Sequence, residues 1–72
     1  MSIYEEIGKT IIFLRKQKCL TQEMLVLECD ISTSYLRLIE HGNANPTINE
    51  LLKIADVLEI ELQNPFLSVN AV

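Results

Sequence analysis

The sequence has few of the residues that build active sites and metal centres. Its 72 residues include one histidine, two cysteines and two glycines, and no tryptophan. Cys19 and Cys29 are ten positions apart and His41 is distant from both, a spacing that fits no zinc site. No glycine-rich phosphate loop is present, and no nucleophile is paired with a base. We therefore expect neither an enzyme nor a bound metal or cofactor.

Long apolar runs are missing too. Within residues 1–20 the longest uncharged stretch is Thr10–Leu14, too short to span a bilayer or to act as a signal sequence. Cys29 falls on the apolar face of a predicted helix and Cys19 in a loop, so both are expected as free thiols in a reducing compartment. These features predict a cytoplasmic protein without a membrane partner.

A chain of this length can form one domain with a small core. Apolar residues make up 49% of the sequence, which is enough for a helical bundle. Bundles of this size are marginally stable alone and often gain stability by association. No ligand-binding domain is expected beside the bundle, so no small-molecule ligand is predicted.

The segment from Thr21 to Gly42 predicts two short helices joined by a tight turn. The hydroxyls of Thr21 and Ser32 can each accept a hydrogen bond from a free N–H of the following turn, which marks two helix starts. Leu36 and Ile39 have the spacing of one helix face, and Gly42 can close the second helix. Two such short helices cannot bury enough surface alone, so this helix-turn-helix unit needs further helices as a scaffold.

The flanking sequence supplies these helices. Ser2 with Glu5, and Thr47 with Glu50, have the spacing of capping boxes, in which two residues satisfy each other's backbone N–H groups. Each pair therefore marks the start of a helix. The expected helices run from about Ile3 to Gln17 and from Thr47 to about Leu58, with a short fifth turn around Leu62–Leu67.

Four segments, LRKQKCLTQEML, ISTSYLRLIEHG, NPT and LLKIADVLEI, resemble in this order the phage repressor and Cro type of helix-turn-helix domain, also called the Xre type. The resemblance covers roughly Ile7 to Phe66. It implies an all-α fold, a compact four- to five-helix bundle of the lambda-repressor-like DNA-binding type, with the third helix in the major groove of double-stranded DNA. Residues 1–66 are then the DNA-binding domain and residues 67–72 a C-terminal tail.

The third helix is expected to carry the contacts that distinguish one DNA sequence from another. Ser34, Arg37 and Leu38 fall on one outer face, where a hydroxyl or a guanidinium can bond a phosphate or a base edge. A leucine at this position can contact thymine methyl groups, belong to a protein interface, or have no role. The expected DNA-binding residues are Arg15, Thr21, Gln22, Ser32, Thr33, Ser34, Tyr35, Arg37, Leu38 and Asn43.

Arg15 and Glu40 are predicted to form a structural ion pair, because the first and third helices should end near each other and a guanidinium can fork onto a carboxylate. The alternative is two separate solvated charges. Gln22, at the start of the second helix, is expected to bond a phosphate or a base edge, or else to be a plain exposed polar residue.

Two of the positions that depart from the family pattern lie where a glycine is usual. Cys19 stands where a glycine usually ends the first helix, and Asp30 replaces the usual turn glycine. A left-handed backbone at Cys19 would cost on the order of 1 kcal/mol, whereas aspartate tolerates this region better.

Charge is the main argument against DNA binding. The chain has six basic and ten acidic residues, a net charge of −4. The excess of basic residues is confined to residues 1–20, which carry four basic against two acidic side chains. We therefore favour a sequence-specific transcriptional regulator that binds DNA as a dimer, and keep as an alternative a protein-interaction module on the same fold, such as an antitoxin or a regulator-binding subunit.

The C-terminal residues are expected to hold this homodimer. They are rich in apolar side chains that a small core has no room to bury. The competing interpretation is a monomer in which the tail folds back over its own domain. The expected interface residues are Leu58, Ile60, Leu62, Phe66, Leu67 and Val69.

Overall fold

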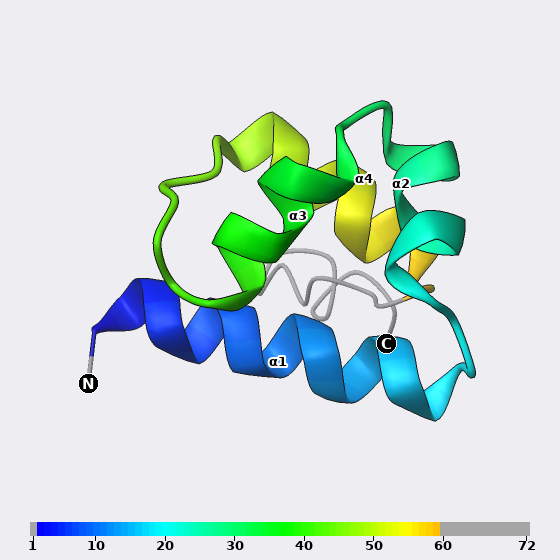
Figure 1. The fold of residues 1–72 in the computed structure, drawn as a ribbon, viewed down its shortest axis with the longest axis horizontal. Coiled ribbons are helices and arrows are strands. Elements are labelled where there is room, and N and C mark those ends of the chain that lie inside the picture. The colour runs from blue at the N-terminus through cyan, green and yellow to red at the C-terminus, as the bar shows by residue number, and fades with distance from the viewer. Residues whose placement is uncertain (1, 60–72) are drawn as a thin grey trace, which may run out of the picture.

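The computed structural model describes residues 2–59, which form four α-helices: α1 (Ile3–Gln17), α2 (Gln22–Cys29), α3 (Thr33–Glu40) and α4 (Ile48–Val57). α1 runs along one side of the molecule, with α2 and α3 crossing above it and α4 behind them (Figure 1). The main packing contacts join α1 to α3, and α2 to both α3 and α4. The all-α prediction is confirmed. The predicted turn at Leu62–Leu67 lies outside the described residues.

Each helix begins where the sequence places a capping residue. The Ser2 hydroxyl accepts from the Glu5 N–H at 3.2 Å, while the Glu5 carboxylate accepts from the Ser2 N–H at 3.3 Å. Thr47 and Glu50 form the same reciprocal pair at 3.1 and 2.8 Å. These bonds satisfy backbone donors that have no partner inside the helix. The helices of the central unit are capped by one hydroxyl each, from Thr21 and Ser32.

The helix ends depend on residues with positive φ. Cys19 and Asp30 both have φ of 56°, and Gly42, after α3, has φ of 75°. Both Cys19 and Asp30 therefore adopt the left-handed conformation. Cys19 accepts a strain of about 1 kcal/mol that a glycine would avoid, and the reversed chain direction lets the Leu20 N–H bond the Arg15 carbonyl at 3.0 Å.

The core lies where the four helices meet. Leu25, Leu36, Ile39 and Leu58 are among its fully buried side chains. Burying each such side chain contributes roughly 1.5–3 kcal/mol. Leu58, expected at a dimer contact, is instead a core residue with 1% of its surface exposed. Leu58, the C-cap of α4, packs into the core cluster, so that part of the interface prediction is wrong.

The close approach of α1 to the end of α3 requires a glycine. A Cβ added at Gly8 would lie 2.4 Å from the backbone oxygen of Glu40. No side chain fits at that distance, so Gly8 lets the two helices touch through their backbones. This contact brings the last turn of α3 onto α1 and prepares the site described below.

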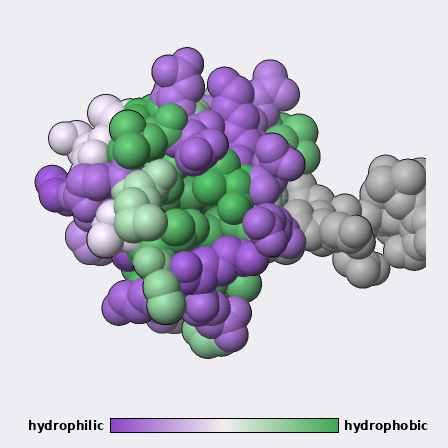
Figure 2. Space-filling view, turned by 90° about the vertical axis from the view of Figure 1, so that its right-hand side faces the viewer, coloured by the Kyte–Doolittle hydropathy of each residue, from purple (hydrophilic) through white to green (hydrophobic). Residues whose placement is uncertain are grey.

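Two apolar areas remain at the surface of the described residues. One lies beside α2, where Leu27 is 84% exposed and Met24 is also exposed, next to Glu28 and Asp56. Figure 2, which views the molecule from the side of α2, shows apolar surface bordered by hydrophilic side chains. The second area is a groove.

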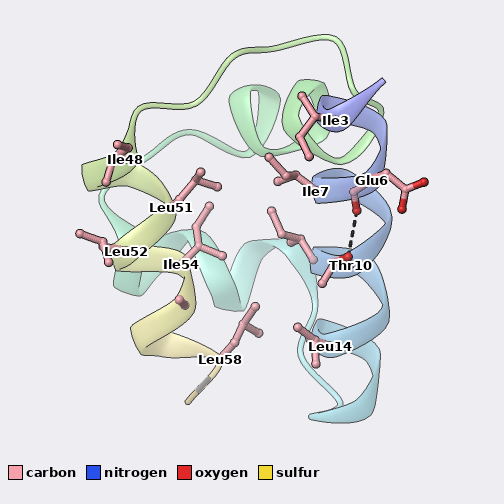
Figure 3. A pocket seen from close by; sticks show the side chains of 12 residues that line it. Ile3, Glu6, Ile7, Thr10, Leu14, Ile48, Leu51, Leu52, Ile54 and Leu58 are labelled. Atoms are coloured by element: carbon pink, nitrogen blue, oxygen red, sulfur yellow. Dashed lines mark hydrogen bonds between the residues drawn. The ribbon is translucent and has the colours of Figure 1, made fainter. Parts of the chain in front are cut away.

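This groove, of about 420 Å³, runs between α1 and α4. Its walls are almost entirely apolar, with Ile7 on α1 facing Leu51 on α4 (Figure 3). Ile48, at its edge, is 76% exposed. No helix within residues 2–59 is long and apolar enough to cross a membrane.

Candidate nucleic-acid interface

α3 has two faces with different chemistry. Leu36 and Ile39 are buried against the other helices. Ser34 and Arg37 are exposed on the opposite side, and Leu38, beside them, is 47% exposed. The predicted division into an inner and an outer face is confirmed. The outer face therefore offers a hydroxyl, a guanidinium and an apolar side chain to a ligand, while the inner face holds the helix in place.

A buried ion pair connects the end of α3 to α1. The Arg15 Nε–H donates to Glu40 Oε2 at 2.9 Å, and a terminal N–H donates to Oε1 at 3.3 Å. The side chains are 12% and 2% exposed. The predicted pair is thus confirmed, in the forked geometry that suits guanidinium and carboxylate. Arg15 also donates to the Leu20 carbonyl at 3.0 Å, which fixes the loop before α2.

Gln22 is not the plain exposed residue of the alternative interpretation, and its expected contact with DNA remains a prediction. Its side-chain amide donates to Glu40 Oε1 at 2.8 Å and accepts from the Arg37 Nε–H at 3.2 Å. The residue is half-buried, and both polar atoms of its side chain are bonded to protein. No periodicity or capping rule predicts this contact, because it joins residues 15 and 18 positions apart on two different helices.

Tyr35 is also engaged within the protein. Its hydroxyl donates to Glu50 Oε1 at 2.8 Å, so the third helix is tied to the first turn of α4. This hydrogen bond raises the pKa of Tyr35 above its ordinary value of 10.0. The backbone N–H of Thr47 and the Tyr35 hydroxyl lower the pKa of Glu50 below 4.5, because both donate to its carboxylate.

The remaining residues expected at the DNA lie around α3. The hydroxyls of Thr21 and Ser32 accept from the N–H groups of Met24 and Tyr35 as helix caps. Asn43 is exposed just after α3. Thr33 is half-buried in the first turn of that helix. Their contacts with DNA remain predictions.

The two cysteines have the environments that the sequence predicts. Cys19 is exposed and Cys29 is buried, and neither forms a disulfide. Burial and the nearby Glu28 raise the pKa of the Cys29 thiol above 9.0, so this thiol is a core group of low reactivity. No group of three metal-ligating side chains occurs among the residues that the structure describes.

Two short helices joined by a tight turn, with a buried face and an exposed polar face on the second, define a helix-turn-helix domain. Residues 11–63 match the helix-turn-helix family. The chain therefore belongs to this family of DNA-binding transcriptional regulators, in its Xre/Cro branch, as the sequence predicts.

Similar proteins include regulators and a repressor. The chain is 39% identical over 61 residues to the HTH-type transcriptional regulator SlrR of Bacillus subtilis, covering 83% of this chain and 40% of that protein. It is 34% identical over 68 residues to the uncharacterized HTH-type regulator y4dJ of Sinorhizobium fredii, covering 90% and 88%. The immunity repressor of Bacillus phage phi105 is 36% identical over 56 residues, covering 78% of this chain and 39% of the repressor.

A solved structure has the same fold. The restriction-modification controller protein C.AhdI from Aeromonas hydrophila matches with a TM-score of 0.78 and 33% sequence identity, over 81% of this chain and 88% of that one. The chain thus spans less than half of SlrR and of the phage repressor but most of the controller protein. The names of the relatives agree with the prediction of a non-enzymatic protein.

We expect Glu40→Ala to destabilise the domain far more than Glu23→Ala. Removing Glu40 leaves Arg15 and the Gln22 amide without their buried acceptor, a loss of about 3–5 kcal/mol in the free energy of unfolding. Glu23 is exposed in the first turn of α2, where a carboxylate contributes roughly 0.3–1 kcal/mol. Urea denaturation of both variants measures the difference, and equal midpoints would contradict a structural role for the pair.

Tyr35→Phe should change how stability depends on pH. The pKa of Glu50 is lowered in the folded state, so its stabilisation is complete above about pH 4.5 and is lost as the pH falls below that value. Without the Tyr35 hydroxyl, the pKa of Glu50 rises toward 4.5, and the variant loses less stability than the wild type between pH 7 and pH 3. Thermal melts across this range and an NMR titration of Glu50 measure both effects. Tyr4→Phe, at an exposed tyrosine of α1, is the control and should follow the wild type.

Proposed function

We propose that this domain is a sequence-specific regulator of transcription that inserts α3 into the major groove of double-stranded DNA. The observation that carries the proposal is the outer face of α3, where exposed Ser34, Arg37 and Leu38 lie opposite a fully buried inner face. A helix of this diameter fits the major groove, where each base pair presents a distinct set of donors and acceptors. The resemblance to a phage repressor and to a restriction-modification controller supports the proposal.

The outer face suits mixed recognition of bases and backbone. The hydroxyl of Ser34 can bond a phosphate or either kind of base edge at short range. Arg37 can bond guanine or a phosphate, and Leu38 can contact a thymine methyl group. Because α3 is short, a single domain can read only a few base pairs, and its affinity is expected to be modest.

Dimerisation would compensate for this modest affinity. Two linked domains bind two half-sites, so the second contact forms at a high effective concentration. The reading helices would lie about 34 Å apart, one turn of DNA, on a two-fold symmetric site. The apolar groove between α1 and α4 supports association, because the exposed Ile48 and Leu52 line it and the chain continues past α4 into residues 60–72, which include Phe66 and Leu67.

A protein-binding role on the same fold is the second candidate. The exposed Met24 and Leu27 beside α2, together with the acidic Glu28 and Asp56, favour it, since acidic residues repel DNA phosphates. A surface of this kind suits a partner with apolar and basic side chains. DNA binding and such a contact use different parts of the domain, so both roles can coexist.

Arg37→Ala should weaken DNA binding without unfolding the domain. Selection from random duplexes first identifies a preferred site. On that site, losing a specific arginine contact lowers affinity by about 10- to 100-fold, the effect of roughly 1–3 kcal/mol. Lys53→Ala removes the same charge from an exposed position on α4 and is the control. Binding isotherms and melting temperatures are measured on the same samples, and enrichment of no duplex by the wild type would refute the proposed function.

The dimer proposal predicts a mass of two chains at micromolar concentration. Light scattering over a dilution series measures it for the whole chain and for a variant lacking residues 67–72. We expect the deletion to shift the equilibrium toward the monomer, because it removes apolar surface from the chain end. A mass of one chain at every concentration, unchanged by the deletion, would exclude this dimer.

A further inference from the structure

A chain of hydrogen bonds leads from the buried ion pair to the outer face of α3. Glu40, already bonded to Arg15, accepts from the Gln22 side-chain N–H at 2.8 Å. The Gln22 side-chain oxygen then accepts from the Arg37 Nε–H at 3.2 Å. Gln22, at the start of α2, thus connects the buried Glu40 carboxylate to the exposed Arg37 guanidinium through these two hydrogen bonds.

Glu40 determines which way the Gln22 amide points. A carboxylate paired with arginine accepts hydrogen bonds and cannot donate them. Only the NH₂ side of the amide can therefore face Glu40, which is 4% exposed and fixed by Arg15. The amide oxygen must face the opposite direction, toward α3. A reversed amide would place two acceptors against each other in a buried site.

This orientation restricts how Arg37 can bind a ligand. A guanidinium forks onto a planar pair of acceptors either through Nε and one terminal nitrogen, or end-on through its two terminal nitrogens. Gln22 occupies the Nε–H, so the end-on fork remains. Within the described part of the chain, the terminal nitrogens of Arg37 have no other hydrogen-bond partner. Their spacing suits the O6 and N7 acceptors of guanine in the major groove.

We propose that Gln22 is a positioning residue that holds Arg37 for end-on recognition of one guanine base. The inference rests on the proposed function, since the guanine lies in the DNA site that α3 reads. Gln22 acts through Arg37 and need not touch the DNA itself. It restricts the long arginine side chain before binding, so less conformational freedom is lost when the complex forms.

The experiment uses the whole chain and the duplex that it selects from a random pool. Each G·C pair of that duplex is replaced in turn by A·T, and the ratio of the two affinities gives the preference for guanine at that position. Gln22→Met keeps the length of the side chain but removes its acceptor and donor. Gln17→Met makes the same change at an exposed glutamine near the end of α1 and is the matched control.

We expect one guanine to be preferred by about 10- to 100-fold, and Gln22→Met to lower that preference by roughly threefold or more. Gln17→Met should leave it unchanged. Arg37→Ala, which removes every donor of the guanidinium, should abolish the preference, and adding Gln22→Met to it should then cause no further loss. Replacing the same guanine by 7-deazaguanine removes the N7 acceptor while keeping every phosphate, and should weaken binding by the wild type but not by Arg37→Ala.

NMR of the free protein tests the arrangement without DNA. The Arg37 Nε–H should exchange slowly with water in the wild type and faster in Gln22→Met, and melting curves show whether each variant is folded. A guanine preference that survives in folded Gln22→Met would overturn the inference while leaving the proposed function intact. If Arg37→Ala loses the same affinity for every duplex, Arg37 contacts a phosphate and not a base, and the inference is also overturned. If the wild type selects no duplex, the proposed function fails and this inference fails with it.

Discussion

The ion pair between Arg15 and Glu40 organises this small domain. Taking both charges out of water is costly, and the cost is offset only because several hydrogen bonds converge on them. Glu40 accepts from Arg15 and Gln22, while Arg15 also donates to the Leu20 carbonyl. The end of α1, the following loop, the start of α2 and the end of α3 are therefore held at one point. A helix-turn-helix unit too short to be stable alone obtains its orientation from this point and from the core beneath it.

The same arrangement connects stability to recognition. α3 is held by Leu36 and Ile39 in the core, by Glu40 at its end, and by Tyr35 bonding to α4. Its outer face carries few charged groups, and the chain as a whole is acidic. A protein with so little positive charge cannot depend on general attraction to phosphates. Under the proposed function, the placement of single side chains on α3, Arg37 above all, matters more than it would in a strongly basic protein.

The domain also leaves several large apolar side chains exposed outside its core. The groove between α1 and α4 and the surface around Leu27 are lined by different residues. Exposed apolar areas of this kind usually mark contacts with other chain segments or proteins. They leave room for assembly and for a protein partner without using the outer face of α3.

The sequence by itself determined the helices and much of the packing. Capping at Ser2, Thr21, Ser32 and Thr47 is local chemistry within four residues, and the faces of α3 follow from helical spacing. Even the Arg15–Glu40 pair was predictable, because the sequence places these two opposite charges at the ends of two helices that should end near each other. Only the tertiary structure decided the hydrogen bonds of Gln22, the Tyr35–Glu50 bond and the burial of Leu58. These depend on how separate helices cross, and side chains distant in sequence meet only once that angle is fixed by packing.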